Sequence, residues 1–239
     1  MRSAGMVAAL RTEVHTLANA DIATHSLRFF KTGPGQYGEG DRFLGIRVPE
    51  LRRLTRKYSA LDDAAALGLL RSDWHEERLL ALMILVQSHE RGDDARREKI
   101  HKVYLANTRY INNWDLVDAS APEVIGSHID GTDLRMLERL ARSKNLWERR
   151  IAIVATLRPI RRGEPGPALR IAELLLHDSD DLIHKAVGWM LREVGKKDQR
   201  VEDVFLRAHC REMPRTMLRY AIERHPESLR QKFLAGTIE

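Results

Sequence analysis

Trp114 and Asp118 are the two residues whose types and spacing most readily support chemistry. Asp118 brings a carboxylate and Trp114 brings a large aromatic face. Residues four apart lie on the same face of a helix, so the two side chains would be neighbours there. For an isolated pair, the usual interpretation is that the aromatic residue packs in the core and the acid faces solvent. A role in chemistry requires that other segments direct unusual residues the same way.

Five predicted helices share a pattern in which a polar residue precedes small and apolar residues. The shared positions are 78, 115, 150, 185 and 215, and they are separated by 37, 35, 35 and 30 residues. A period of this length with two helices per unit indicates a helical-repeat solenoid of the HEAT kind. Counted from the shared position, the offsets −1, +3, 0 and +4 form one helical face. They are occupied by Trp114, Asp118, Arg150 and Trp189. We therefore expect these side chains to line one groove, although Trp189 also fits a place in the core between repeats.

A carboxylate between aromatic faces suits a cationic ligand, because an indole face attracts a cation by about 0.5–2 kcal/mol. Arg150 could hold the carboxylate or a nearby phosphate. The net charge of +6 favours a polyanionic partner if the excess lies on one face. A purine alkylated at N3 or N7 in DNA is a cation attached to a polyanion. Loss of that base leaves an oxocarbenium-like sugar, which Asp118 could stabilise while it positions water, and the cationic base needs no general acid.

Helices are expected to position these residues, because helical periodicity runs along the whole chain and no alternating strand pattern is present. A hydrophobic share of 43% and a charged share of 31% are typical of a globular chain. We predict an all-α fold, a right-handed α–α superhelix of HEAT-like repeats with a concave basic groove. It forms a single domain over residues 1–239, with 1–6 and 236–239 frayed. The predicted helices cover residues 7–19, 21–31, 49–59, 63–71, 74–89, 94–107, 113–127, 133–143, 146–158, 165–177, 181–195, 199–210, 213–224 and 226–235. Many of them are preceded by a residue type that caps helices: Asp62, Ser72-Asp73, Asp93, Asn112, Thr132, Asn145, Asp180 and Asp198.

The segment 32–42 is a glycine-rich loop that contains Gly33-x-Gly35-x-x-Gly38. This spacing formally matches a dinucleotide-binding fingerprint, but the fingerprint requires a preceding strand and a following helix. A predicted helix precedes the loop instead, so we reject a dinucleotide site. Two interpretations stay open, namely a plain surface loop and a loop whose amides, with Lys31, face a phosphate.

The sequence offers no metal or cofactor site. Cys210 is the single cysteine, which excludes an intramolecular disulfide and suits a reducing compartment. It is expected to be a buried small hydrophobe. His75-Glu76 lacks the second histidine that a zinc-protease motif needs four residues after the first. No apolar run of 18 residues occurs, so we expect no membrane span and a cytoplasmic protein.

The chain resembles the AlkD-like DNA alkylation-repair glycosylases, a family of HEAT-like repeat proteins. The likeness extends from about Leu10 to Leu234. Its most specific segments are Phe43–Pro49 (FLGIRVP), Trp114–Asp118 (WDLVD), Asn145–Arg150 (NLWERR) and Lys185–Glu193 (KAVGWMLRE). The resemblance implies a monofunctional glycosylase, a hydrolase of N-glycosyl bonds. It would excise cationic 3-methyladenine- and 7-methylguanine-type bases from double-stranded DNA without extruding the base. The protein would act as a monomer, without a metal or another cofactor.

By the same resemblance, Asp118 corresponds to the catalytic carboxylate, Trp114 and Trp189 to aromatic residues that contact the sugar, and Arg150 to the groove arginine. Further DNA contacts are expected from Phe29, Lys31, Arg47, Arg52 and Arg192. The chain departs from the family pattern in having Phe29 where close members have tyrosine, and in its longer loop 32–42. Two other interpretations stay open: a non-catalytic HEAT array that binds branched or distorted DNA, and a scaffold whose groove holds a peptide.

Overall fold

In the described residues of this computed structural model, 2–129 and 133–238 (side chains from residue 5 on), helices account for the regular structure and no β-strand occurs. An isolated bridge pairs Arg42 with Trp74. The prediction of an all-α fold is therefore confirmed. The internal contacts divide the chain into two compact units, residues 1–120 (unit 1) and residues 121–239 (unit 2). Within the described part, no helix is both long enough and apolar enough to cross a membrane.

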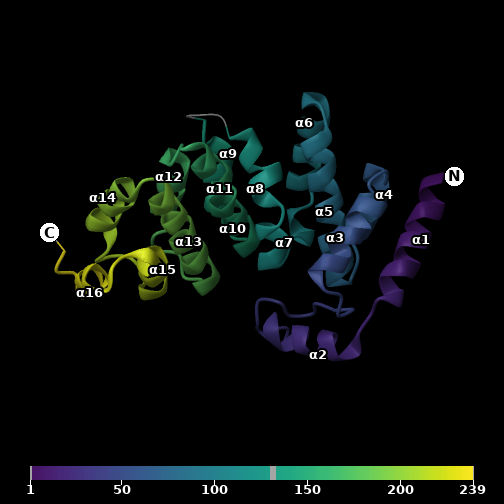
Figure 1. Ribbon diagram of the computed structural model, residues 1–239, viewed down its shortest axis with the longest axis horizontal. Coiled ribbons are helices and arrows are strands. Elements are labelled where there is room, and N and C mark those ends of the chain that lie inside the picture. Colours follow the sequence, from purple (N-terminus) through teal and green to yellow (C-terminus); the bar gives the residue numbers. More distant parts are fainter. Residues whose placement is uncertain (1, 130–132, 239) are drawn as a thin grey trace. The chain divides into compact units, whose positions relative to one another are not determined.

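Unit 1 is built around α5, which packs against α3, α4, α6 and α7 (Figure 1). Helix α5 presents leucine and isoleucine to these neighbours on several sides, so most of its length is buried. The helices of unit 1 are α1 (Arg2–Thr16), α2 (Ala20–Phe29), α3 (Val48–Lys57), α4 (Asp63–Leu70), α5 (His75–Arg91), α6 (Asp94–Leu105), the 3₁₀ helix η1 (Thr108–Tyr110) and α7 (Trp114–Asp118). Four charged or polar residues in the first turn of α5 are also buried: His75, Glu76, Glu77 and Arg78.

Unit 2 is built around α13, which packs against α10, α11, α12, α14 and α15 (Figure 1). Its helices are α8 (Ala121–Val124), the 3₁₀ helix η2 (Gly126–His128), α9 (Arg135–Ala141), α10 (Leu146–Val154), α11 (Leu157–Arg162), α12 (Gly166–Leu174), α13 (Asp181–Lys197), α14 (Gln199–His209), α15 (Arg215–Ala221), the 3₁₀ helix η3 (Ile222–Arg224) and α16 (Glu227–Ala235). Gly188 lets α13 lie against the backbone of α15, because a β-carbon there would meet the Met217 carbonyl oxygen at 2.4 Å. Cys210 is free and buried, as predicted.

Two predicted helices are interrupted at prolines. The predicted helix 113–127 ends at Asp118 as α7 and resumes at Ala121 as α8. Pro122 has no N–H to donate to the Asp118 carbonyl, and its ring would clash with that oxygen. The predicted helix 146–158 is likewise divided into α10 and α11, because Pro159 of α11 has no N–H to donate to the Ala155 carbonyl. The predictions of continuous helices at these two places were wrong.

Helix starts agree with the predicted caps where a short polar side chain accepts a first-turn N–H. This is observed for Asp62, Asp93, Asn145, Asp180 and Asp198. Asn113, not the predicted Asn112, caps α7, and Trp74, not the predicted Ser72 or Asp73, is the residue before α5. The predicted cap Thr132 lies outside the described residues. Helix α1 begins at Arg2, five residues before the predicted start at Val7.

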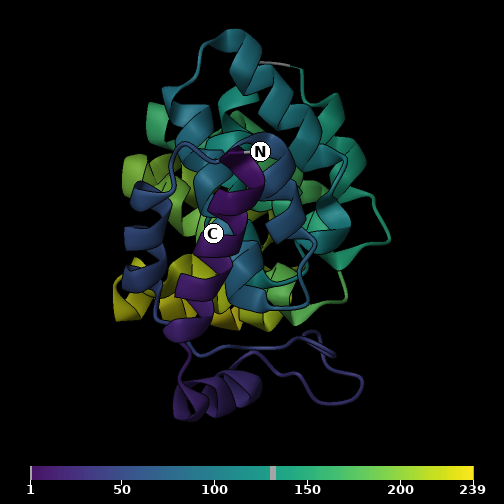
Figure 2. The same cartoon turned by 90° about the vertical axis from the view of Figure 1, so that its right-hand side faces the viewer.

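Helix α2 and the loop that follows it lie to one side of the other helices of unit 1, in both views (Figures 1 and 2). None of the residues Ala20–Phe29, all of which are described, is buried. Leu27 is 40% exposed and Phe29 is 55% exposed. This helix therefore adds surface to unit 1 and almost nothing to its core.

Candidate functional site

Helix α7 carries both residues that the sequence singled out, Trp114 at its first position and Asp118 at its last. Both side chains are half-buried, so each keeps some exposure to solvent. A helix of five residues cannot stabilise itself, because the few hydrogen bonds it forms do not offset the cost of nucleation. The position of α7 must therefore come from its contacts with the rest of unit 1.

A buried network of hydrogen bonds holds the first turn of α7. His75 lies between two carboxylates, with Nδ1 at 2.9 Å from Oδ2 of Asp41 and Nε2 at 2.8 Å from Oδ2 of Asp115. Asn113 donates from Nδ2 to Asp41 at 3.1 Å and accepts the Trp114 N–H at 2.8 Å. Oδ1 of Asp115 accepts the Leu116 N–H at 2.9 Å. Two backbone donors at the start of α7 are thus fixed by side chains of one network.

The hydrogen bonds of this network shift the pKa values of its members. Burial alone would lower the pKa of His75, but its hydrogen bonds to Asp115 and Asp41 and the charges of these two carboxylates raise the pKa to about 9. Burial likewise opposes ionisation of Asp41, while His75 and the paired Arg78 guanidinium hold the Asp41 pKa below its usual range. The His75 imidazole and the Arg78 guanidinium therefore face the side chains of Asp41 and Asp115, and this pairing offsets much of the desolvation cost.

An aromatic stack holds Trp114 itself. The Trp114 ring lies on Phe30 with centroids 5.4 Å apart and planes at 20°. Phe30 stacks on Phe43 at 4.9 Å, and Phe43 stacks on the His75 imidazole at 4.5 Å. Exposed Phe29 meets Trp114 edge to face at 5.9 Å. Each aromatic pair contributes about 0.5–1.5 kcal/mol beyond the burial of its area. The indole is therefore fixed next to an exposed aromatic side chain.

The Tyr104 and Ser120 side chains fix the other end of α7. The Tyr104 hydroxyl is fully buried and lies 2.9 Å from the Ser120 hydroxyl oxygen, which is 2.5 Å from the Leu116 carbonyl oxygen. Burial raises the pKa of Tyr104, and the charge of Asp118 adds to the shift. Asp118 is thus close enough to this buried hydroxyl to act on it electrostatically.

The segment 43–46 is held by a single carboxylate. Glu76 accepts the backbone N–H groups of Leu44, Gly45 and Ile46 at 2.9, 2.8 and 3.2 Å. Gly45 has φ of 81°, and a β-carbon there would meet the Asn19 carbonyl oxygen at 2.1 Å, so only glycine fits. This segment carries Phe43, and it therefore supports the aromatic stack beneath Trp114.

The basic residues in helix α3 and directly before it lie in two different environments. Arg53 and Lys57 pair with Glu13 of α1 at 3.0 and 2.6 Å, so their charge is balanced. Arg47 and Arg52 are exposed, and within residues 2–129 and 133–238 no ion pair is found for either side chain. Lys31 is exposed after the end of α2, with a φ of 51°. These three cations of unit 1 are available to an anionic partner.

The glycine-rich loop uses its own side chains to satisfy its amides. Gln36 accepts the Gly33 N–H at 3.0 Å, and Glu39 accepts the Gly35 N–H at 2.9 Å. The Gly38 N–H bonds to the Lys31 carbonyl at 3.2 Å. These three amides are already bonded, which favours the surface-loop interpretation over a phosphate-binding one. Helix α2 precedes the loop, and no strand does, so a dinucleotide-binding unit is absent there.

The remaining predicted residues lie in unit 2. Arg150 of α10 is only 5% exposed and donates from Nη1 to the Leu182 carbonyl at 2.8 Å, at the start of α13. Trp189 on α13 is half-buried, and its indole N–H donates to Glu193 at 3.1 Å. Arg192 pairs with Glu223, and its side chain is 18% exposed. Arg150 thus supports the helix that carries Trp189, and a DNA contact by Arg192 would require its ion pair to open. That residues of both units line one groove stays a prediction.

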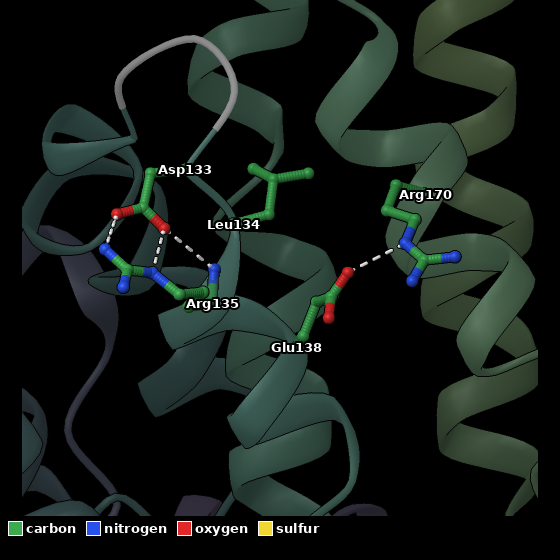
Figure 3. A pocket seen from close by; sticks show the side chains of 5 residues that line it. All are labelled: Asp133, Leu134, Arg135, Glu138 and Arg170. Atoms are coloured by element: carbon green, nitrogen blue, oxygen red, sulfur yellow. Dashed lines mark hydrogen bonds and ion pairs between the residues drawn. The ribbon is translucent and has the colours of Figure 1, made fainter.

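A surface hollow of about 560 Å³ lies between α9 and α12 (Figure 3). Its charged side chains pair with one another: Arg135 contacts Asp133 at 2.6 Å and Arg170 contacts Glu138 at 2.8 Å. These pairs lower the pKa of Asp133, to about 2, and that of Glu138. The hollow therefore offers neither an acid that is protonated at neutral pH nor an unpaired charge, and it contains none of the predicted site residues.

Sequence reasoning missed the network beneath α7. In the sequence His75 suggests only a possible metal ligand, and no local pattern pairs it with Asp41 or Asp115. A signal in the sequence is the run of four consecutive charged or polar residues from His75 to Arg78 at the start of an otherwise apolar helix. Because the rest of that helix is buried, these residues are expected to be buried with it. Buried groups of this kind need partners, and the acids near Trp114 and at the end of the loop could supply them.

The comparisons with known proteins point to one family. A family model described as DNA alkylation repair enzyme matches residues 10–225. A solved structure described as a predicted DNA alkylation repair enzyme from Enterococcus faecalis is similar, with a TM-score of 0.68 and 16% identity, over 88% of this chain and 97% of the other. The crystal structure of smu.31 from Streptococcus mutans UA159 is similar with a TM-score of 0.51 and 16% identity, over 97% and 98% of the chains. No curated protein matches.

Proposed function

The chain belongs to the DNA alkylation repair enzyme family, and from this premise we propose that it is a monofunctional DNA glycosylase. It hydrolyses the N-glycosidic bond of cationic alkylated purines, of the 3-methyladenine and 7-methylguanine type, in duplex DNA and without base flipping. One observation carries this proposal. A carboxylate and an indole, both half-buried, lie at the two ends of a short helix whose first turn is held by partly buried hydrogen bonds.

In this mechanism Asp118 faces the sugar of the damaged nucleotide. As the bond to the base lengthens, positive charge develops on the sugar, and the carboxylate stabilises it and orients the attacking water. The base departs as a neutral purine because it was already cationic, so no protein acid is needed. Trp114 packs against the nucleotide, and its ring face attracts the developing cation.

The groups of unit 2 complete the proposed site. Trp189 is the second aromatic contact to the sugar. Arg150 positions the start of α13 through the Leu182 carbonyl, and this is consistent with a supporting role at the site. Convergence of these residues with Trp114 and Asp118 is part of the proposal, as is the HEAT-like solenoid with a concave basic groove.

Contacts to the DNA backbone come from exposed residues of unit 1. Arg47, Arg52 and Lys31 supply cations, and Phe29 supplies an exposed aromatic face beside Trp114. Phosphate contacts of this type position the duplex and make binding sensitive to salt. The protein binds as a monomer, and Arg192 joins the backbone contacts when its pair with Glu223 opens.

To test the proposal, the protein is incubated with a duplex that carries a single 7-methylguanine or 3-methyladenine, and the released free base is measured. We expect Asp118→Asn to reduce release by about 100-fold or more while DNA affinity changes little, because the carboxylate acts on the transition state. Asp94→Asn, at an exposed carboxylate in the first turn of α6, is the matched control and should release base at the parent rate. Equal rates for Asp118→Asn and the parent protein would refute the mechanism.

The same assay separates the proposal from its main alternative. A non-catalytic array for branched or distorted DNA would bind with strong salt dependence and release no base. A parent protein that binds a four-way junction more tightly than the lesion duplex and leaves every base attached would establish that alternative.

A further inference from the structure

We propose that His75, Asp41 and Asp115 are positioning residues for the site, and that they set the orientation of Trp114 and Asp118 by fixing the first turn of α7. The expected effect on the rate of base excision rests on the proposed function. The orientation of α7 itself can be tested without any activity. The residues come from three separate parts of unit 1: the loop before Phe43, the start of α5 and α7 itself.

The imidazole of His75 links these parts with both of its nitrogens in use. One nitrogen binds Asp41 and the other binds Asp115, so the ring cannot rotate without breaking a buried hydrogen bond. Asp41 is further held by Arg78 and by the Asn113 amide. Asn113 in turn caps the Trp114 N–H. The path from Asp41 to the backbone of Trp114 therefore contains a single intermediate side chain.

The same imidazole forms one end of the aromatic stack. His75 lies on Phe43, Phe43 lies on Phe30, and the indole of Trp114 lies on Phe30. The network thus fixes Trp114 twice, once through its backbone N–H and once through its ring. A shift of the His75 ring would be transmitted along both routes.

A buried ionic network is a costly way to stabilise a fold, because well-packed apolar side chains can do so equally well or better. Such a network is suited to specifying one orientation, since hydrogen bonds have defined directions. Helix α7 needs this, because it is too short to hold its own geometry and because Asp118 is at its far end. Catalytic groups must be held within about 0.5 Å of their working position.

Two variants test the proposal, His75→Gln and Asp115→Asn, each made in the full chain. Both remove a link between α5 and α7, and Asp115→Asn keeps the shape of the side chain. The matched control is Glu77→Gln. Glu77 is another buried ionic residue of the first turn of α5, but it pairs with Arg11 and His15 of α1. A general loss of stability would affect all three variants, whereas loss of positioning would affect only the first two.

Excision is measured in single turnovers at saturating enzyme, together with the Kd for the lesion duplex. We expect His75→Gln and Asp115→Asn to slow excision by about 10- to 100-fold, because small misplacements of reacting groups have effects of this size. The Kd should change by less than about twofold, since the network does not contact DNA and supports groups that act mainly in the transition state. Glu77→Gln should match the parent in both measurements.

The indole N–H signals of the ¹⁵N-labelled protein give a readout that does not depend on activity. The Trp114 signal is identified by its loss in Trp114→Phe, and the signals of Trp147 and Trp189 serve as internal references. We expect the Trp114 signal to shift in Asp115→Asn and in His75→Gln, and to stay in place in Glu77→Gln. The reference signals should stay in place throughout.

The outcomes distinguish the two proposals. If the parent protein releases no base, the proposed function fails, and the indole signals alone decide whether the network positions α7. An unmoved Trp114 signal in both network variants would overturn the inference. So would excision rates in His75→Gln and Asp115→Asn that fall no further than the rate of the Glu77 control.

Discussion

Replacement of Glu76 by glutamine should destabilise the protein far more than the exchange of one oxygen for an NH₂ group suggests. The Glu76 carboxylate accepts three backbone N–H groups, one on Oε2 from Leu44 and two on Oε1 from Gly45 and Ile46. A glutamine oxygen can keep two of them, but its NH₂ group then faces the third N–H, donor against donor. One buried donor without a partner, together with weaker neutral hydrogen bonds, should cost roughly 2–4 kcal/mol.

Thermal unfolding at pH 7 gives the overall effect, with an expected fall in Tm of roughly 5–15 °C. Hydrogen exchange locates it, because the amides of residues 44–46 should lose protection before those of α5. Glu77→Gln is the control: its partners Arg11 and His15 are nearly half exposed, so we expect a loss of only about 1 kcal/mol. A Tm within about 2 °C of the parent and unchanged protection at residues 44–46 would refute this account of how the segment is held.

Two further predictions concern charge. Arg52→Ala should weaken DNA binding and reduce the slope of log Kd against log salt concentration by about one. Arg53→Ala is the control and should leave the slope unchanged, because Arg53 is already paired with Glu13 and Glu50. Equal slopes for the two variants would show that Arg52 does not contact the DNA. Burial raises the pKa of Glu202 to about 8; the charge of Asp203 adds to this shift and that of Arg192 opposes it. Between about pH 4.5 and pH 8 the folded protein therefore holds a proton on Glu202 that the unfolded chain has released. The free energy of unfolding should fall as the pH rises through this range. Glu202→Gln should abolish this contribution to the fall in stability, which is at most about 5 kcal/mol. Denaturant unfolding of both proteins at pH 5 and pH 8 measures it. An identical pH dependence of stability in the two proteins would show that Glu202 ionises freely.

The helical fold could be predicted because each helix carries its own local information. Apolar periodicity located the helices, and short polar residues such as Asp62 and Asp180 marked their starts. The breaks at Pro122 and Pro159 were also readable, since a proline removes the hydrogen bond four residues back. The break at Pro122 was missed because the apolar pattern continues across that proline. The second prediction stopped at residue 158, just before Pro159, whereas the lost hydrogen bond lies four residues back and α10 ends at Val154.

The candidate site was predictable only in part, because its support is formed by residues distant in sequence. Trp114 and Asp118 could be chosen from their types and spacing, and Phe29 is beside Trp114. The pairing of His75 with Asp41, 34 residues earlier, and with Asp115, 40 residues later, has no local signature. Arg150 was expected to face a groove, but its position in the repeat did not reveal that its guanidinium reaches the Leu182 carbonyl.

The exposure of α2 has a consequence for how this molecule can change over evolutionary time. A helix without a buried side chain contributes little to the free energy of unfolding, so most substitutions on it leave the rest of the chain folded. Substitutions at Phe29 and Leu27 should therefore alter binding at this surface but leave the fold intact, whereas Phe30, Phe43 and Gly45 pack against other parts of unit 1. Selection could adjust the outer helix to new partners without disturbing the frame that carries it.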